Sequence, residues 1–269
     1  MTASCRICGG TTRITHRATV LGRHEATYRM CDACAYWSVD EPHWLDEAYS
    51  EAVAAIDTGV VQRNLHLYPR LASALVRMFG STGTYVDYGA GYGLLVRLLR
   101  DVGLDVYWQD AHCENLFARG FEWEGSRPEA AAAVTAVEVM EHVTDPLAFV
   151  DTCLRDTGAH SFVFTQHLHD LSADPSWWYL APEAGQHISF YAPRTMPVLA
   201  ERLGMTYHSA GTLHLLTKRN FRRGAFARSV RFHRISYALL RRRLRSRVMP
   251  DHRLLAGQVC RIGDRVLQA

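Results

Sequence analysis

The stretch TYVDYGAGYG, from Thr84 to Gly93, decides the fold. A β-branched and apolar approach leads to Asp87, and three glycines then follow at alternate positions. Leucines and valines recur at helical spacing from Leu94 onward, so the glycine loop is expected between a strand and a helix. Glycine suits such a loop because it adopts backbone angles closed to other residues and lets a ligand approach the backbone. We therefore predict a strand, a loop and a helix that hold a nucleotide-like ligand.

Two further apolar runs end in acidic residues. The run Leu104 to Trp108 is followed by Asp110, nineteen residues after Gly91, and the run Ala133 to Val137 is followed by the segment EVMEHV, which starts at Glu138. The carboxyl ends of parallel strands meet at one edge of a sheet, where ligands of open α/β sheets bind. We expect these acids to lie beside the glycine loop.

Together the three motifs resemble those of the class I S-adenosylmethionine (SAM) dependent methyltransferases, over roughly residues 60–218. The resemblance implies an α/β fold with a Rossmann-like sheet of seven strands, the last antiparallel, and SAM as cofactor. It implies that the glycine loop holds the methionyl part of SAM and that the acid after the second strand holds the ribose. The cofactor-binding residues that it implies are Asp87, Gly89, Ala90, Gly91, Gly93, Asp110, Glu138 and His142. An NAD(P) enzyme is the alternative, although such enzymes more often show the spacing Gly-x-Gly-x-x-Gly.

Length and composition favour one catalytic domain with additions at either side. The chain has 269 residues, and its hydrophobic content of 48% is enough for a full core. No apolar run approaches the roughly 20 residues that a membrane-spanning helix needs, and the first ten residues lack the apolar core of a signal peptide. We expect no transmembrane segment and a cytoplasmic location.

Four cysteines near the start have the spacing of a zinc ribbon, which we assign to residues 1–42. Two C-x2-C knuckles are separated by 22 residues. Four thiolates satisfy Zn²⁺ completely, so this metal site is expected to be structural rather than catalytic. A redox or catalytic cysteine is the weaker interpretation, since a redox motif needs only one knuckle. The predicted ligands are Cys5, Cys8, Cys31 and Cys34.

The methyltransferase domain is expected over residues 43–218, with a helical lid or lead-in over 43–80. Trp44 and Tyr49 fall at helical spacing and are candidates to close over the cofactor. Arg63 and Asn64 start the next expected helix, where a solvated face is the simpler interpretation than a contact with cofactor or substrate.

A long aromatic insertion after the strand Ser161 to Thr165 is expected to form the acceptor pocket. Within it, GQHISFY (Gly185 to Tyr191) resembles a loop of methyltransferases of nucleotide-sugar and polysaccharide pathways. In related sugar methyltransferases a histidine here serves as base, and His187 is our candidate. The other candidates for the base are Glu183, Tyr179, His142 and His167. The candidate substrate contacts are Trp178, Tyr179, Glu183, Gln186 and Tyr191.

Residues 219–269 are expected to be an arginine-rich amphipathic extension. Residues 218–250 carry a charge of +12 without any acid, so the rest of the chain sums to −9. Apolar residues recur between the arginines at helical steps and need burial. We expect this tail to pack against the protein's own surface or against a second subunit, which would make a homodimer.

The leading functional hypothesis is transfer of a methyl group from SAM to a hydroxyl of a small polar acceptor, a sugar or nucleotide sugar. One alternative is a zinc-ribbon rRNA or tRNA base methyltransferase, whose arginine-rich tail would contact nucleic acid phosphates. The acidic body argues against it. The other alternative is a non-catalytic SAM-binding subunit, which the complete cofactor motif makes less attractive.

Overall fold

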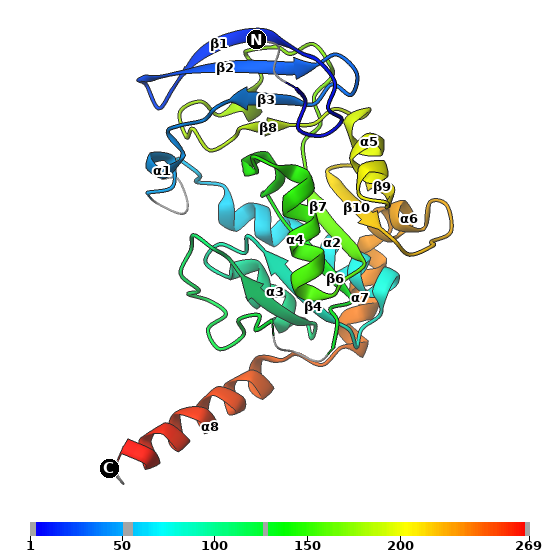
Figure 1. Ribbon diagram of the computed structural model, residues 1–269. Helices are drawn as coiled ribbons and strands as arrows, with labels where there is room; N and C mark the ends of the chain where they lie inside the picture. Colours follow the sequence, from blue (N-terminus) through cyan, green and yellow to red (C-terminus); the bar gives the residue numbers. More distant parts are fainter. Residues whose placement is uncertain (1–3, 51–55, 126–128, 267–269) are drawn as a thin grey trace.

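The structure is a computed structural model that describes residues 4–50, 56–125 and 129–266, with only the backbone described over 258–266. A six-stranded sheet of order β5-β4-β6-β7-β10-β9 forms its centre (Figure 1). Four neighbouring strands run parallel, and β10 runs antiparallel to both β7 and β9. The predicted α/β fold with a mostly parallel sheet and an antiparallel last strand is confirmed. The strands are β4 (Thr84–Tyr88), β5 (Asp105–Gln109), β6 (Ala133–Ala136), β7 (Ser161–Thr165), β9 (Thr206–Ala210) and β10 (Leu213–Thr217).

The prediction of seven strands is wrong for the described residues, where this sheet has six. Beside β5, where a seventh strand could pair, there is only a single parallel bridge between Trp108 and Glu122 among the described residues. Trp108 N donates to Phe121 O at 2.8 Å, and Trp123 N donates to Trp108 O at 2.8 Å. This segment is too short to continue the ladder, because Gly120 turns the chain with a φ of 82° immediately before it.

Helices cover both faces of the sheet, because the strands alternate their apolar side chains between two buried clusters. Phe162 and Phe164 of β7 join the cluster under α4 (Pro146–Thr157) and α5 (Thr195–Arg202). Val163, between them, joins the cluster under α2 (Val60–Phe79) and α3 (Leu94–Asp101). A strand buried on both faces in this way belongs to the middle of a three-layer fold.

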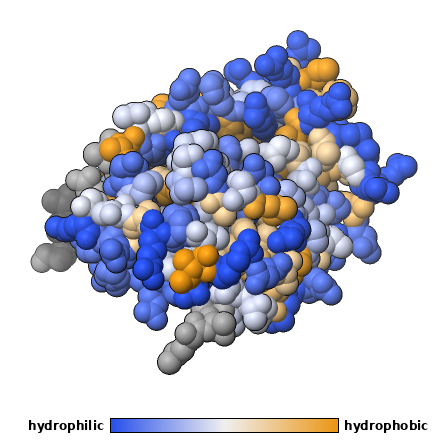
Figure 2. Space-filling model, turned by 90° about the horizontal axis from the view of Figure 1, so that it is seen from above, coloured by the Kyte–Doolittle hydropathy of each residue, from blue (hydrophilic) through white to orange (hydrophobic). Residues whose placement is uncertain are grey.

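The N-terminal segment forms a second, antiparallel sheet of order β1-β2-β3-β8. Its first three strands are β1 (Thr12–Val20), β2 (His24–Cys31) and β3 (Trp37–Asp40), whereas β8 (Ser189–Phe190) comes from the insertion that follows β7. The buried Tyr36 hydroxyl also lies 2.6 Å from Ser189 Oγ. The predicted ribbon segment is therefore joined to the methyltransferase domain by backbone pairing. Seen from this side of the molecule, hydrophobic residues are scattered among hydrophilic ones (Figure 2).

The C-terminal segment forms three helices, α6 (Ala225–Arg231), α7 (His233–Arg243) and α8 (Val248–Val266). The first two pack on α2. Ser73 Oγ donates to Ser229 O of α6 at 3.4 Å. Arg77 Nε donates to Ser236 Oγ of α7 at 2.9 Å, and the rings of Tyr68 and Tyr237 meet edge to face at 5.7 Å. Helices α6 and α7 thus pack on the protein's own surface, which is one of the two arrangements expected for the tail. Residues 267–269 of the predicted extension lie outside the described residues.

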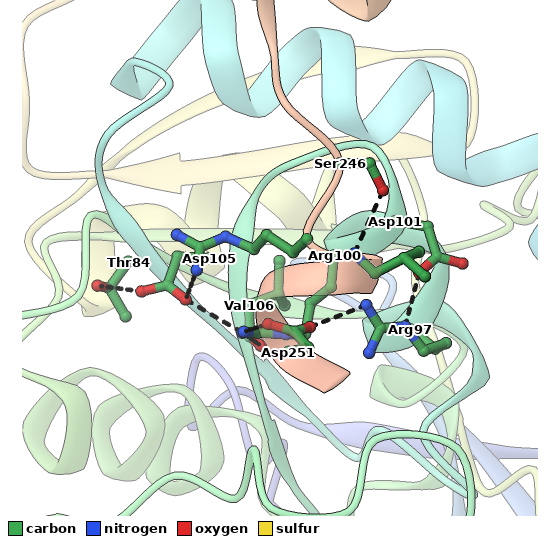
Figure 3. Close-up of polar contacts among 10 residues, drawn as sticks. Thr84, Arg97, Arg100, Asp101, Asp105, Val106, Ser246 and Asp251 are labelled. Carbon is green, nitrogen blue, oxygen red and sulfur yellow. Dashed lines mark hydrogen bonds and ion pairs between the residues drawn. The ribbon is translucent and has the colours of Figure 1, made fainter. Parts of the chain in front are cut away.

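Helix α8 projects from the body and is attached at its first turns by a buried ion cluster (Figures 1 and 3). Arg100 of α3 donates twice to Asp251, from Nε and from Nη2, each at 2.8 Å. Arg97 Nη2 adds a third bond to Asp251 at 2.9 Å. The Arg100 guanidinium also lies 3.7 Å from the ring centre of Phe121. Among the described helices, none combines the length and apolar character that crossing a membrane requires.

Candidate active site

The glycine loop after β4 has one open position and two tightly packed ones. Gly89, Gly91 and Gly93 all have positive φ, at 68°, 53° and 86°. A Cβ on Gly89 would lie 2.6 Å from a methyl of Val139, and one on Gly93 would lie 2.7 Å from Asn115 Oδ1. A Cβ on Gly91 would meet no atom within 4 Å. The loop therefore packs against the ends of other strands and leaves open space at Gly91.

Asp110 holds the glycine loop at the end of β5. Its Oδ2 accepts from Gly91 N at 2.8 Å, and its Oδ1 accepts from His112 N at 2.7 Å and from Cys113 N at 2.9 Å. Oδ2 keeps a second lone pair, so these bonds leave capacity for one ligand hydroxyl. The structure thus brings the predicted ribose acid to the predicted methionyl loop.

Asp87, by contrast, is buried beneath the loop with 2% of its surface exposed. It accepts a hydrogen bond from Thr135 Oγ1 of β6. Burial raises the pKa of this carboxyl to about 7. Asp87 thus ties β4 to β6 and, in the described contacts, bonds within the sheet.

The end of β6 turns sharply at Glu138, whose φ of 54° is unusual for a residue with a side chain. Thr165 at the end of β7 holds this turn: Glu138 N donates to Thr165 Oγ1 at 2.8 Å, and that hydroxyl donates to Glu138 Oε1 at 2.7 Å. The turn leads into the short helix η1 (Met140–His142). It therefore sets the position of Glu141 and His142.

Glu141, His142 and His187 form one group, with a potential ligand atom from each within 4.8 Å of the others. The Glu141 side chain is fully buried. Its Oε1 accepts from the Tyr179 hydroxyl at 2.8 Å, whereas its Oε2 has no hydrogen-bond partner among the described residues. Burial, and then the neighbouring charge of Glu138, raise the pKa of Glu141 to about 8.

Backbone carbonyls fix the orientation of both histidines. His142 Nδ1 lies 3.2 Å from Gln186 O, and His187 Nδ1 lies 2.6 Å from Tyr179 O. Because a carbonyl only accepts, each Nδ1 carries the proton of the neutral ring and each Nε2 has a free lone pair. The rings stand nearly perpendicular with centroids 4.9 Å apart. Burial lowers the pKa of both histidines, that of His142 to about 3.

The segment around α1 (Leu45–Ala48) supports the loop that carries His187. Trp44 Nε1 donates to Gly185 O at 2.9 Å, and Gln186 Nε2 donates to Ala48 O at 2.8 Å. Tyr49 stacks on His112 at 5.3 Å and lies 6.2 Å from His142. It thereby spans the ends of β5 and η1. Residues 51–55 of the predicted lid lie outside the described residues.

The predicted substrate contacts are dispersed. Trp178 is 70% exposed and its ring lies 5.3 Å from His167. Glu183 is exposed. Tyr191 is fully buried and donates to Met140 O at 3.0 Å. Tyr179 reaches the buried group through Glu141, and Gln186 supports the loop, so these contacts do not converge on one surface.

Sequence reasoning quoted Glu141 inside its motif but assigned it no role, and it did not single out His112. From the sequence alone, a glutamate directly before a histidine is most simply interpreted as part of a solvent-exposed turn. Only the structure shows which residues bury it. Its partners, Tyr179 and Ile188, come from the insertion after β7: Ile188 N donates to Glu141 O at 2.8 Å.

The four predicted thiols lie together in the N-terminal sheet, within 4.8 Å of one another. The Sγ atoms of Cys5 and Cys34 are 3.6 Å apart, and those of Cys8 and Cys31 are 3.4 Å apart. Backbone N–H groups of Ile7, Gly10 and Cys34 point at three of the sulfurs, at 3.4 to 3.5 Å. Such N–H donors stabilise thiolates, so the donor set fits a closed tetrahedral metal site.

Several solved structures are similar to the chain at low sequence identity. Magnesium protoporphyrin IX methyltransferase from Synechocystis PCC 6803 with bound SAM is 12% identical, covers 64% of this chain and 88% of that one, and has a TM-score of 0.42. The mitomycin 7-O-methyltransferase is 15% identical, with 66% and 68% coverage and a TM-score of 0.36. An O-methyltransferase from neocarzinostatin biosynthesis, in complex with S-adenosylhomocysteine and 1,4-dihydroxy-2-naphthoic acid, is 13% identical, with 64% and 60% coverage and a TM-score of 0.43.

Sequence comparison decides the family. No curated protein sequence matches the chain. A family model described as a methyltransferase domain matches residues 62–210, more than half of the chain. The match contains the glycine loop, all three acidic strand ends and His187. The protein therefore belongs to this methyltransferase domain family.

Proposed function

We propose that the protein transfers a methyl group from SAM to a hydroxyl of a small polar acceptor, a sugar or nucleotide sugar. The observation that carries this proposal is His187: its Nδ1 is bonded to Tyr179 O at 2.6 Å, so its Nε2 has a free lone pair. His187 belongs to the group with Glu141 and His142 at the end of β6, whose turn packs Val139 on Gly89 of the cofactor loop.

The donor side of the proposal rests on the loop and on the family. Open space at Gly91 lets a ligand approach the backbone, and Asp110 lies next to it. SAM supplies the sulfonium methyl group. As the bond from oxygen to the methyl carbon forms, the bond from carbon to sulfur breaks, and S-adenosylhomocysteine leaves. The protein has only to align the two reactants and remove the hydroxyl proton.

On the acceptor side, His187 Nε2 would receive that proton. A neutral imidazole is suited to this, and burial keeps the ring neutral by lowering its pKa. The exposed Trp178 beside His167 supports a sugar-like acceptor, since a bare indole face packs on the apolar face of a sugar ring.

The four thiols are proposed to hold one structural Zn²⁺. Their sheet is completed by β8, which begins two residues after His187. Metal binding at Cys5, Cys8, Cys31 and Cys34 would therefore support the loop that carries His187, without a direct part in the chemistry.

The test is methyl transfer from SAM carrying a deuterated methyl group to a panel of sugars and nucleotide sugars, followed by mass spectrometry. His187→Ala should lower turnover by about 10² to 10⁴ while SAM affinity, measured by calorimetry, changes little. His66→Ala, at an exposed position of α2, is the matched control. Wild-type turnover in His187→Ala would contradict the assigned role, and methylation of RNA alone would contradict the acceptor class.

A further inference from the structure

We propose that Glu141, His142 and His187 bind a divalent cation that coordinates the acceptor hydroxyl. The three residues contribute one carboxylate oxygen and two imidazole nitrogens, all within 4.8 Å of one another. Two ligands of one cation, each at about 2.1 Å, lie no more than about 4.2 Å apart. Small side-chain movements are therefore enough to bring the three atoms to one ion.

The buried carboxyl group of Glu141 has one oxygen without a hydrogen-bond partner among the described residues. Glu141 is fully buried, and its Oε2 has no partner among the described residues, although Oε1 accepts from the Tyr179 hydroxyl. An unpartnered buried carboxylate oxygen is costly, because it loses its hydration without compensation. A cation at Oε2 would remove that cost.

Both imidazoles are oriented as metal ligands usually are. Each donates its Nδ1 proton to a backbone carbonyl, His142 to Gln186 O and His187 to Tyr179 O, so Nε2 is the nitrogen left for an ion. Such outer bonds fix the tautomer and the ring direction of metal-binding histidines. The bond from Ile188 N to Glu141 O, 2.8 Å long, ties the segment of His187 to η1. The ligands therefore come from two parts of the chain held together by the fold.

The surrounding charges favour a cation. Glu138 lies close enough for its negative charge to act on Glu141. Arg63, whose positive charge also acts on Glu141, is already paired with both oxygens of Asp57, at 2.7 and 2.6 Å. Its charge is largely neutralised, so Arg63 opposes a cation at the end of β6 only weakly.

The donor set indicates which ions fit. One carboxylate and two imidazoles suit Mn²⁺, Fe²⁺ or Zn²⁺, whereas the four thiols of the N-terminal sheet suit Zn²⁺ and disfavour Mn²⁺. Three protein ligands leave positions free for the acceptor. An acceptor with oxygens on adjacent carbons, such as a sugar diol, would fill two of them. The cation would lower the pKa of the bound hydroxyl, which releases its proton to water before the methyl group arrives.

The role of the cation rests on the proposed function, but the existence of the site does not. In the metal-bound enzyme His187 Nε2 is a ligand, and this histidine activates the hydroxyl through the ion instead of accepting its proton. The two roles of His187 make different predictions in the presence of a chelator.

The direct test is metal content and Mn²⁺ uptake, with Mn²⁺ chosen because thiolates bind it poorly. Protein purified without chelator is analysed for resident metals and titrated with Mn²⁺, with the free ion followed by electron paramagnetic resonance. The wild type should hold one more divalent cation than Glu141→Gln and His142→Ala, or bind it at least about tenfold more tightly. Glu201→Gln, an exposed glutamate of α5, and His66→Ala are the matched controls. Far-ultraviolet circular dichroism spectra that match that of the wild type show that each variant is folded.

Equal metal content and Mn²⁺ affinity in the wild type and both variants would overturn the proposal. So would a wild type that holds no metal beyond the one at the thiols and takes up no Mn²⁺. Methyl transfer that persists in chelator would overturn the role of the cation and leave His187 as a base. Mn²⁺ binding lost in both variants, but without methyl transfer to any acceptor, would support the site and count against the proposed function.

Discussion

The segments before and after the methyltransferase domain are attached to it in different ways. The N-terminal sheet shares backbone hydrogen bonds with β8, and Trp44 and Ala48 bond to the loop that carries His187. The C-terminal helices pack on α2 and α3 through side chains and an ion cluster at Asp251 (Figure 3). The first attachment shapes the candidate active site, whereas the second stabilises the opposite end of the domain. Substitutions in the first attachment should therefore lower turnover, whereas substitutions in the second should lower the free energy of unfolding.

The largest effect is expected from Cys34→Ser, which removes one thiol from the closed group. Structural zinc sites in small domains contribute about 10 kcal/mol or more to folding, so the N-terminal sheet should lose its metal and its order. Because β8 would lose its partner strand, turnover should fall together with zinc content. Elemental analysis, near-ultraviolet circular dichroism and methyl-transfer assays measure the three quantities.

Cys113→Ser is the control for that experiment, since Cys113 is half-buried and lies outside the thiol group. It should keep the zinc content of the wild type. Full turnover in a Cys34→Ser protein that has lost its metal would break the proposed link between the N-terminal sheet and the active site.

Asp251→Ala is expected to have a smaller effect, which lowers the stability of the protein but not its turnover. Arg100, 1% exposed, would lose both bonds to this carboxylate and remain as a buried charge. A buried charge left without any partner costs about 3 to 5 kcal/mol. The loss should be smaller here, because Arg100 keeps a bond to Asp105 Oδ1 at 3.1 Å. Chemical denaturation should show this loss, while turnover well below the melting temperature should stay close to that of the wild type.

Asp101→Ala is the matched control, because Asp101 pairs with Arg97 one turn away on the surface of α3. Such exposed pairs contribute about 0.3 to 0.5 kcal/mol. A parallel fall of turnover and stability in Asp251→Ala would show that the C-terminal segment also reaches the active site.

The smallest effect is expected from Tyr36→Phe, which removes one bond between the N-terminal sheet and β8. The Ser189 hydroxyl donates to Val143 O, so it accepts from Tyr36. Loss of this buried bond should destabilise the protein by about 1 to 2 kcal/mol. A double-mutant cycle with Ser189→Ala, followed by thermal unfolding, isolates the pair. A coupling energy near zero would show that backbone pairing alone joins the two parts.

Sequence motifs predicted those parts of the fold that depend on residues close together in the chain. The turn after β4 needs positive φ at three positions, and glycine adopts it without strain, so Gly89, Gly91 and Gly93 were recognisable from their spacing. The two cysteine knuckles were equally easy to recognise, because a short turn brings the two thiols of each pair together. The number of strands was not, because the missing one depends on how far residues 121–123 can pair with β5.

The candidate site was only partly predictable, since its character comes from burial by distant residues. His187 was found through a resemblance, and Glu138 and His142 through a motif. The importance of Glu141 depends on Tyr179, 38 positions away, which buries its carboxylate and satisfies only one oxygen. Neither periodicity nor composition reports such a contact.

The pairing of β3 with β8 also constrains how the chain folds during synthesis. Ser38 of β3 pairs with Ser189 of β8, so β3 stays an unpaired edge strand until roughly 150 further residues have been translated. At about 5 to 20 residues per second this takes about 8 to 30 s. During that time β3 presents unpaired backbone groups, which is a hazard for pairing with other chains. Early capture of a metal ion by the thiols, all within the first 34 residues, would keep the nascent sheet compact until its last strand arrives.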